Sequence, residues 1–440
     1  MQVCIGVGHN PKTEITMKTF PSLALGALTA AVALLFGGAA QAQIQNIEKL
    51  KQMKVSGTDP NIPMVPQGGK NADQLRENLK RIKMPPGFKI DLYAVVPDAR
   101  SMAVAPSTNM LFVGTRKTTV WAVTNRNSGD TATEVKEFAP SLKFHNPNAV
   151  CWTKDGFLIV VESNRVLTFP AAEFFYEGAD VAVGEVVPQG QLIPPEEESF
   201  NHSGRVCRIG PDNKLYITLG QPFNVPPREK LALYTKWGIG GIVRMNQDGT
   251  GREVYATGVR NSVGMDFNPK DKTLWFTDNQ TDGMGDDIPM GEINRATKPG
   301  EFFGYPYIVS KTRITENGYD KDPLPANAVN PQVMTIAHAA DLGMAFYTGK
   351  QFPAAYQNGF FSAQHGSWNR TKPVGARVLF TSLKADGTAD KTAVFAEGWL
   401  DDDTGIYRGR PVDVAVAKDG SLLVSDDYAG AIYRITYTAP

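Results

Sequence analysis

The amino-acid sequence predicts an all-β fold, a six-bladed β-propeller with four-stranded blades. From Phe88 onward, short segments rich in β-branched and aromatic residues alternate with Asp-Gly, Asn-Lys or Lys-Asp turns, and helix-length periodicity disappears. One strand–turn–strand unit also returns six times along the chain. A unit of this kind cannot bury both faces of its sheet alone, so several units pack around a common axis.

The repeated unit is a strand, a polar turn and a second, more apolar strand. Its copies run over residues 102–114, 149–161, 206–218, 263–277, 343–363 and 412–425. Segments 241–250 and 377–388 also carry an Asp-Gly turn, which predicts outer strands of a blade. We expect Phe88–Val95 to close the ring against Ala431–Tyr437. The competing fold, two stacked β-domains, lacks a linker near the middle of the chain.

The first 42 residues have the pattern of a secretory signal. Lys18 precedes an apolar run over residues 23–36, and Ala40-Gln41-Ala42 ends the region. This pattern predicts translation from Met17, cleavage after Ala42 and a periplasmic or secreted protein. The apolar run is short for a membrane span, and an uncleaved anchor is the alternative.

After residues 1–42, the sequence predicts a strap over residues 43–86 and the propeller over residues 87–440. The strap is polar and contains Pro and Gly. It includes a short helix, for which Asn71 is the expected cap. Leu75, Leu79 and Ile82 fall on one face of that helix, and Pro85-Pro86 ends it.

The charge balance and the cysteines limit the class of protein. The 440 residues carry 45 basic and 45 acidic side chains, so the chain has no general attraction to nucleic acid. Cleavage would leave Cys151 and Cys207, which either pair or stay buried as thiols. The sequence has no Cys-x-x-Cys-His segment for a covalently attached haem.

Histidines and arginines occur next to the repeated strands. Equivalent loops of a propeller open on the same end of its channel, so these side chains are expected to converge there. The histidines are His145, His202, His338 and His365, and the arginines are Arg100, Arg260, Arg370, Arg408 and Arg410. Together the arginines predict an anion site. Taken one at a time, hydrogen-bonded structural histidines and solvated surface arginines are the alternative.

The segment 258–287 is the strongest single candidate. Arg260-Asn261 enters it before a strand pair, and a loop rich in Gly, Asp and Asn leaves it. Loops of this composition can direct backbone groups at a ligand while the strands hold them apart. The alternative is an inert surface hairpin.

In several segments the sequence resembles the soluble quinoprotein glucose/sorbosone dehydrogenases, and is closest to their sorbosone and pyranose dehydrogenase branch. The resemblance runs from Met84 to the C-terminus. It rests on His202-Ser-Gly-Arg, Gly210-Pro-Asp-Asn-Lys-Leu-Tyr, Gly258-Val-Arg-Asn, Asp278-Asn-Gln-Thr-Asp-Gly-Met-Gly-Asp-Asp, Phe303-Gly-Tyr-Pro, Gln364-His-Gly-Ser-Trp-Asn-Arg and Arg408-Gly-Arg-Pro.

This resemblance implies a six-bladed propeller that uses pyrroloquinoline quinone (PQQ) and Ca²⁺. His202 matches the family's general base, while Arg260 and Asn261 match the pair beside the quinone oxygens. The backbone carbonyls of Thr281 and Asp282 match the ligands of the catalytic Ca²⁺. Other implied cofactor contacts are Arg100, Arg370, Arg408 and Arg410 for the PQQ carboxylates, and His338 in place of an aromatic over the cofactor.

The chain also departs from the family pattern. Gln221 stands where glucose-oxidising relatives carry an acidic residue, and Val412 rather than Arg precedes Asp413. The family's cofactor lysine is missing, which leaves His365, Asn369, Arg370 or Lys372 to replace it. Asp286, Asp287 and Glu292 either bind a structural Ca²⁺ or only solvate their loop, and we favour solvation.

The sequence therefore predicts a PQQ- and Ca²⁺-dependent dehydrogenase of an aldose, a sorbosone-like hydroxy-aldehyde or a related sugar. Electrons would pass to a separate acceptor, a cytochrome or a quinone. No nucleic-acid partner is expected, nor an integral membrane form after signal cleavage. One alternative is a Ca²⁺-dependent propeller lactonase that uses Asn148, Asn261 and Asp278. The other is a non-catalytic ligand-binding propeller.

Overall fold

The computed structural model describes residues 54–57, 61–62, 64–127, 129–177 and 180–439. The predicted signal region, with its start at Met17 and its cleavage after Ala42, lies outside these residues. Within the described ranges, no helix is long and apolar enough to cross a membrane.

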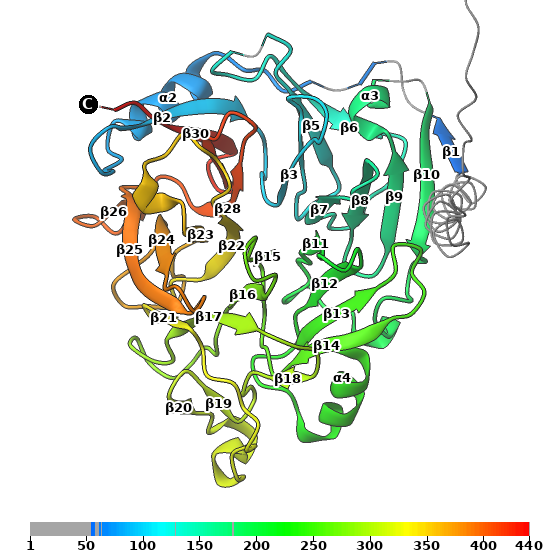
Figure 1. Cartoon of the computed structure of the whole chain (residues 1–440), viewed down its shortest axis with the longest axis vertical. Coiled ribbons are helices and arrows are strands. Elements are labelled where there is room, and N and C mark those ends of the chain that lie inside the picture. The colour runs from blue at the N-terminus through cyan, green and yellow to red at the C-terminus, as the bar shows by residue number, and fades with distance from the viewer. Residues whose placement is uncertain (1–53, 58–60, 63, 128, 178–179, 440) are drawn as a thin grey trace, which may run out of the picture. The chain divides into compact units, whose positions relative to one another are not determined.

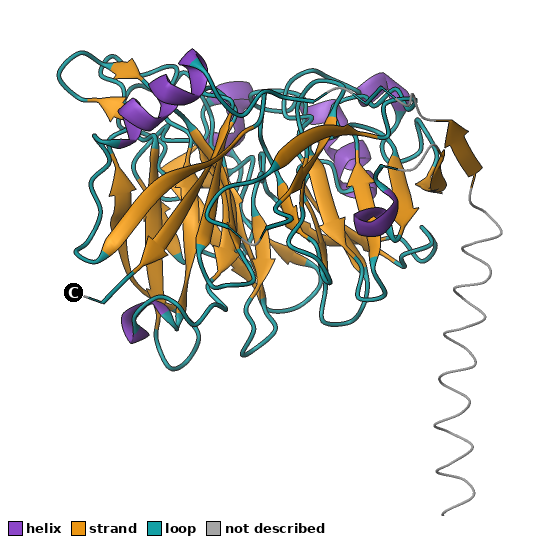
Figure 2. Cartoon of the chain, turned by 90° about the horizontal axis from the view of Figure 1, so that it is seen from above, coloured by secondary structure: helices purple, strands orange, loops and turns teal. Residues whose placement is uncertain are grey.

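The described residues form six sheets of four or five strands around one axis (Figure 1). The innermost strand of each sheet contacts the innermost strands of the two neighbouring sheets. These contacts follow the closed order β3, β7, β11, β15, β22, β28 and back to β3. Figure 2, turned by 90°, shows the strands running between two ends that carry the loops. The prediction of a six-bladed β-propeller is confirmed.

The first three blades follow the chain in order. Blade 1 contains β3 (Met102–Val104), β4 (Leu111–Val113), β5 (Val120–Thr124) and β6 (Glu134–Phe138). Blade 2 contains β7 (Ala149–Trp152), β8 (Phe157–Val161), β9 (Val166–Pro170) and β10 (Asp180–Val187), with β1 (Lys54–Gly57) added beside β10. Blade 3 contains β11 (Cys207–Ile209), β12 (Leu215–Leu219), β13 (Gly241–Met245) and β14 (Glu253–Thr257), with β18 (Glu301–Phe302) parallel to β14.

The last three blades complete the ring. Blade 4 contains β15 (Met265–Phe267), β16 (Leu274–Asp278), β17 (Gly291–Ala296) and β21 (Val333–Thr335). Blade 5 contains β22 (Asp341–Phe346), β23 (Gly359–Gln364), β24 (Arg377–Leu383) and β25 (Ala389–Glu397). Blade 6 contains β28 (Pro411–Val416), β29 (Leu422–Asp426), β30 (Ala431–Tyr437) and β2 (Phe88–Val95).

Smaller elements lie in the connections between these strands. They are α2 (Lys70–Leu79), α3 (Ala172–Phe175), α4 (Leu231–Trp237), β19 (Ile308–Val309), β20 (Thr312–Arg313), β26 (Leu400–Asp401), β27 (Ile406–Tyr407), η1 (Pro195–Glu197), η2 (Arg228–Lys230), η3 (Glu316–Lys321) and η4 (Ala354–Tyr356).

Each of the six predicted repeats falls on the first two strands of one blade, as expected. The second strand is the more apolar of the two because neighbouring blades cover both of its faces. All five residues of β12 and of β16 are buried. The predicted outer segments form the third strands, β13 and β24.

The propeller is closed by pairing the two ends of the described ring. β2 lies antiparallel to β30, from Phe88 opposite Tyr437 to Val95 opposite Ala431. This confirms the predicted closure. Strand β2, from the N-terminal part of the chain, is therefore the fourth strand of the blade whose other three strands are C-terminal.

The predicted N-terminal helix exists as α2, but its expected cap is wrong. The helix begins at Lys70 and its N-cap is Gly69 with φ 88°, so Asn71 lies inside the first turn. Glycine adopts this left-handed backbone freely, which lets the helix begin before Asn71. Leu75 and Leu79 are buried, as predicted.

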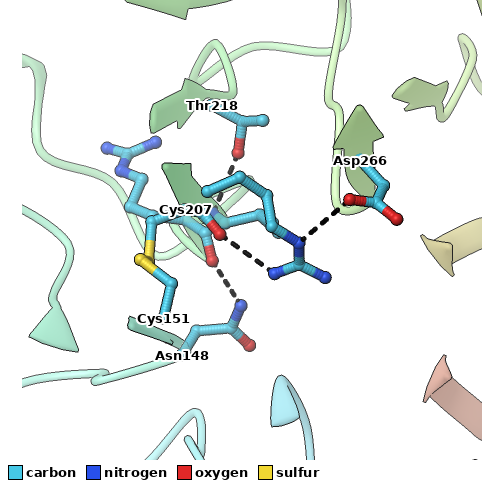
Figure 3. Close-up of a disulfide and its surroundings, with 8 residues drawn as sticks. Asn148, Cys151, Cys207, Thr218 and Asp266 are labelled. Atoms are coloured by element: carbon cyan, nitrogen blue, oxygen red, sulfur yellow. Dashed lines mark hydrogen bonds and ion pairs between the residues drawn. A yellow bond between two sulfur atoms is a disulfide. The ribbon is translucent and has the colours of Figure 1, made fainter. Parts of the chain in front are cut away.

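A disulfide between Cys151 and Cys207 settles the alternative that the sequence left open (Figure 3). Cys151 lies on β7 and Cys207 on β11, so the bond joins the innermost strands of blades 2 and 3. A hydrogen bond supports the same junction, because Asn148 Nδ2 donates to the Arg205 carbonyl (2.6 Å). Within blade 3, the Val206 N–H donates to Thr218 Oγ1 (3.0 Å).

Candidate active site

The strand order brings two sets of chain segments to one end of the ring. In an antiparallel pair, the start of the first strand lies beside the end of the second. The segments that enter β3, β11, β15 and β22 therefore meet the segments that leave β4, β16 and β23. Most of the predicted site residues lie on these segments.

These segments line a cavity of about 280 Å³. Among the predicted residues, it is lined by Arg100, His202, Arg260, Asn261, Asp282, His338 and His365. The order of these residues in the chain spreads them over 266 positions, from 100 to 365, and the propeller brings them to one place.

His202 is held in a position suited to a base. The backbone at His202 has φ 54°, a strained conformation that often marks functional residues. Its Nδ1 lies 2.6 Å from the Gln221 carbonyl, which can only accept, so Nδ1 carries the hydrogen. In the neutral ring Nε2 then has a free lone pair. Burial, together with the charge of Arg260, lowers the pKa of His202 to about 4.

Arg260 is buried beside the cavity and is fixed by several contacts. Its guanidinium pairs with the Asp282 carboxylate (3.1 Å) and donates to the carbonyl and the side chain of Asn224 (3.0 and 2.9 Å). The backbone N–H groups of Arg260 and Asn261 both donate to the Asp278 carboxylate. Consequently the Arg-Asn pair enters the site in one fixed orientation.

Arg100, Asp427 and His365 form a second network, which joins three blades. Asp427 pairs through one carboxylate oxygen with Arg100 and through the other with His365 Nε2 (2.8 Å). Arg100 Nε also donates to Asn148 Oδ1 (2.6 Å). Burial works to raise the pKa of Asp427, but the charge of Arg100 and the His365 hydrogen bond hold it well below its usual range. Burial lowers the pKa of His365.

His338 fastens the loop that follows β16. Its Nε2 donates to the carbonyls of Gly285 (2.8 Å) and Ile288 (3.0 Å). On the other side of the ring Nδ1 lies 3.3 Å from Asn369 Nδ2, and Asn369 also donates to the Asp282 carboxylate (2.7 Å). His338 is therefore a hydrogen-bonded bridge between the two loops as well as a residue of the cavity wall.

Buried carboxyl groups lie behind the cavity wall. Asp278 and Glu292 are opposite each other on β16 and β17, and both are 1% exposed. Burial raises the pKa of Asp278 to about 6, and burial with the Asp278 charge raises that of Glu292 to about 8. Burial also raises the pKa of Asp341 to about 6.

The expectation that Glu292 only solvates its loop is wrong, because this carboxyl group faces the protein interior. Asp287 fits that expectation, since its side chain is 91% exposed. Asp286 accepts a hydrogen bond from the Thr371 N–H (3.0 Å).

Three predicted cofactor arginines do not line the cavity. The guanidinium of Arg370 binds the Asp286 carbonyl and the Asp287 carboxylate, so it supports the loop after β16. Arg410 donates to the carbonyls of His365 (2.9 Å) and Gly366 (2.6 Å).

Arg408 is the third of them. Its guanidinium lies 3.6 Å from the Asp401 carboxylate. The predicted arginine ring is thus divided. Arg100 and Arg260 line the cavity, whereas Arg370 and Arg410 bind backbone carbonyls and Arg408 lies beside a carboxylate.

Of the two predicted Ca²⁺ ligands, only Asp282 is among the residues that line the cavity. Its carbonyl accepts a hydrogen bond from Asn224 Nδ2 (3.2 Å). Thr281 is 1% exposed, and its hydroxyl faces the Met284 sulfur (3.8 Å). Among the described residues, no group of three or more His, Cys, Asp or Glu side chains is arranged to hold a metal ion.

Three amide oxygens of the cavity wall have no hydrogen-bond partner in the described part of the chain. They are Asn261 Oδ1, Gln280 Oε1 and Asn369 Oδ1, and all are buried. Buried polar atoms are almost always satisfied, so unpartnered oxygens beside a cavity suggest that a ligand satisfies them.

The sequence reasoning missed several residues of this site. Arg116 and Trp368 line the cavity, and Asp427 joins Arg100 to His365. The signal for Arg116 and Asp427 was their place just after the second strand of a blade, β4 or β29. Trp368 belongs to the motif Gln364-His-Gly-Ser-Trp-Asn-Arg, but only the structure shows that it lines the cavity and that it is 76% exposed. Of the candidates for the missing lysine, His365 and Asn369 line the cavity.

A six-bladed propeller with a cavity lined by arginines and a half-buried histidine at one end of its channel defines a ligand-binding or catalytic propeller. Residues 191–434 match the glucose/sorbosone dehydrogenase family, and the chain belongs to that family of sugar dehydrogenases. It shares 39% identity over 249 residues with an uncharacterised protein of Borreliella burgdorferi. With the aldose sugar dehydrogenase of Escherichia coli it shares 24% identity over 261 residues.

Each of these two matches covers 55% of this chain and 62% of the relative's length. Among solved structures, the holo form of the pyranose dehydrogenase PQQ domain from Coprinopsis cinerea superposes with a TM-score of 0.65. That match has 18% sequence identity and covers 81% of this chain and 97% of the other, which supports the fold.

Proposed function

We propose that this protein is a PQQ- and Ca²⁺-dependent oxidoreductase. Its substrate would be an aldose, a sorbosone-like hydroxy-aldehyde or a related sugar. The observation that carries the proposal is the meeting of His202 with Arg260 and Asn261 at one cavity, although His202 precedes blade 3 and the Arg-Asn pair precedes blade 4. Family membership and the resemblance of the sequence to quinoprotein dehydrogenases support it.

The residues of the cavity suit PQQ, which is an ortho-quinone with three carboxylates. Arg100 and Arg260 supply buried positive charge beside the cavity. PQQ would supply the hydride acceptor. Arg260 and Asn261, in fixed orientation, would stabilise negative charge that develops on its oxygens.

Ca²⁺ also fits the donors that are present. It prefers oxygen ligands, including backbone and amide carbonyls. The backbone carbonyls of Thr281 and Asp282 are the predicted ligands. The unpartnered oxygens of Asn261 and Gln280 are further oxygen donors of the same kind.

His202 would take the proton from the substrate hydroxyl while hydride leaves the adjacent carbon. Because Nδ1 is committed to the Gln221 carbonyl, the proton goes to Nε2. Trp368, exposed beside the cavity, offers an aromatic face on which a sugar ring can stack. The substrate loses two electrons, which a separate cytochrome or quinone would accept.

The lactonase alternative receives less support from these contacts. Both polar ends of the Asn148 side chain are engaged, one with Arg100 and the other with the Arg205 carbonyl. The Asp278 carboxylate accepts two backbone N–H groups. Neither side chain is free to bind a channel metal in the way that a hydrolase of this kind needs.

Activity after reconstitution tests the proposal. The purified protein, loaded with PQQ and Ca²⁺, is expected to reduce a redox dye when an aldose or hydroxy-aldehyde is added, and chelation should abolish the reaction. A panel of sugars then identifies the substrate. Lactone hydrolysis without PQQ, with no dye reduction on any sugar, would favour the hydrolase instead. A periplasmic or secreted location belongs to the same proposal and is tested by fractionation.

A further inference from the structure

The most unusual cation of the cavity is Arg116, which the proposed chemistry does not use. It lies in the turn between β4 and β5 and lines the cavity with His202 and Arg260. The turn is held firmly. The Arg116 N–H donates to the Asp98 carboxylate (2.7 Å), and Thr115 Oγ1 donates to the Thr119 carbonyl (2.6 Å).

Arg116 differs from the other cavity arginines in its partners. Arg100 is paired with Asp427, and Arg260 with Asp282. In the described part of the chain, by contrast, the guanidinium of Arg116 makes no hydrogen bond or ion pair that neutralises it; it lies over the Phe200 ring, 5.1 Å from the ring centre. Its charge is therefore available to a ligand.

The carboxyl groups of the cavity do not compensate for this charge. Asp282 is paired with Arg260 and Asn369, and Asp278 accepts backbone N–H groups. Asp341 accepts from Thr335 and from Gln364 Nε2 (2.9 Å). Burial and the charge of Arg100 lower the pKa of Arg116 against the smaller opposing effects of Asp427 and Asp98, and Arg116 contributes in turn to the lowered pKa of His202.

The position of Arg116 separates it from the proposed cofactor contacts. Arg100 and Arg260 are 5% and 3% exposed, whereas Arg116 is exposed at the cavity mouth. Its neighbour Phe200 is 81% exposed. A ligand that enters and leaves through this mouth passes the free guanidinium close to His202, the proposed proton acceptor.

We propose that Arg116, backed by Phe200, binds the carboxylate of the substrate, so that the substrate class is sugar acids such as uronates. An arginine guanidinium binds a carboxylate through two parallel N–H groups, which also orients the sugar. This inference rests on the proposed dehydrogenase function and narrows its substrate.

The test compares glucuronate with glucose in protein loaded with PQQ and Ca²⁺. The wild-type protein is expected to prefer glucuronate in kcat/KM. Arg116→Gln should lower the glucuronate-to-glucose ratio about 10- to 100-fold, as expected for one lost charged hydrogen-bonding partner. Arg116→Lys should restore part of the ratio. Arg76→Gln, on the surface of α2, is the matched control and should leave the ratio unchanged.

Two further readouts separate the possible explanations. Fluorescence titration gives the Kd for PQQ of wild type and Arg116→Gln. A large loss of PQQ affinity with an unchanged ratio would mean that Arg116 binds the cofactor, and would overturn the substrate assignment. An unchanged ratio together with unchanged PQQ affinity would overturn it as well.

Calorimetric titration of the unloaded protein with glucuronate needs no turnover. Weaker glucuronate binding by Arg116→Gln than by Arg76→Gln would support the inference even if PQQ does not bind. Absence of PQQ binding in the wild type would instead refute the proposed function. Circular dichroism and thermal melting show whether each variant is folded.

Discussion

At the residue scale, the proposed chemistry depends most on His202. Its hydrogen bond to the Gln221 carbonyl fixes the tautomer, and its strained backbone holds the ring at the cavity. A base prepared in this way contributes about 10²- to 10⁴-fold to the rate of a proton-transfer step. Arg260 is the second determinant, because its charge adds to burial in lowering the pKa of His202.

Replacing His202 by alanine should lower kcat by about 10²- to 10⁴-fold. The cavity arginines remain, so the affinity for PQQ should change little. His145→Ala is the matched control, since His145 is exposed and does not line the cavity. Dye reduction and PQQ titration measure the two effects. Equal rates in the two variants would remove His202 from the mechanism.

The decline of kcat/KM at low pH should follow the protonation of His202. Its pKa is lowered to about 4, so the ring stays neutral and able to accept a proton at every pH above that value. We expect kcat/KM to hold steady as the pH falls from about 8 to about 5, and to decline near pH 4. A decline centred near the ordinary histidine value, about 6.5, would contradict this environment.

The sequence predicted the kinds of residues at the site better than their orientations. Arg100 and Arg410 both precede an inner strand, yet only Arg100 lines the cavity. Arg410 binds backbone carbonyls of the loop after β23. Every residue has a backbone carbonyl, so the sequence does not show which carbonyls bind an arginine. Only the three-dimensional structure identifies them. Arg116 and Trp368 were missed for a related reason, because the course of their loops was unknown.

At the element scale, the disulfide between β7 and β11 is a distinct source of stability. It closes a loop of 56 residues between two neighbouring blades, and restricting such a loop stabilises the folded state by about 4 kcal/mol in the chain-entropy model. The bond joins innermost strands, so it resists separation of blades 2 and 3 at the axis.

Replacing both Cys151 and Cys207 by serine should lower the free energy of unfolding by about 2 to 4 kcal/mol. Urea denaturation with and without a reductant measures this effect. The reductant should lower the midpoint of the wild-type protein and leave that of the double variant unchanged. An equal response of the two proteins to the reductant would show that the cysteines are not paired.

The buried Asp278–Glu292 pair between β16 and β17 predicts a dependence of stability on pH. The folded pKa of Glu292 is raised from 4.5 to about 8, so the folded protein keeps a proton that the unfolded chain releases. Stability should therefore fall as the pH rises from about 4.5 to about 8.

Glu292→Gln retains the neutral form at every pH, and Asn294 Oδ1, which has no partner in the described ranges, can accept the new N–H. The variant should melt several degrees above wild type at pH about 8, and close to wild type at pH about 5. Thermal melts in a chelating buffer measure the difference and keep metal binding out of the comparison. A lower melting temperature for Glu292→Gln at the higher pH would contradict the assignment.

At the scale of the whole molecule, the fold was largely predictable because the strand–turn–strand unit of each blade recurs as a recognisable pattern in the sequence. Each second strand is an apolar run that neighbouring blades cover on both faces, as in Leu215–Leu219. The closure of β2 against β30 followed from the need to complete the last blade. The ligand cavity was harder to predict, since its walls are connections such as 278–290, whose course depends on contacts with distant loops.

The ring also explains how one site draws on so many blades. Arg100, Asp427 and His365 belong to three different blades, and a single carboxylate joins them. His338 and Asn369 link the loops that leave β16 and β23. The closed propeller thus fixes the positions of residues that no single blade could hold together.

Titration of the purified protein with PQQ, followed by absorbance with Ca²⁺ present, tests the central claim most directly. We predict a saturable spectral change with one PQQ bound per chain, and weaker binding when Ca²⁺ is chelated. Absence of any saturable change with Ca²⁺ present would contradict the assignment of this cavity as a quinone site.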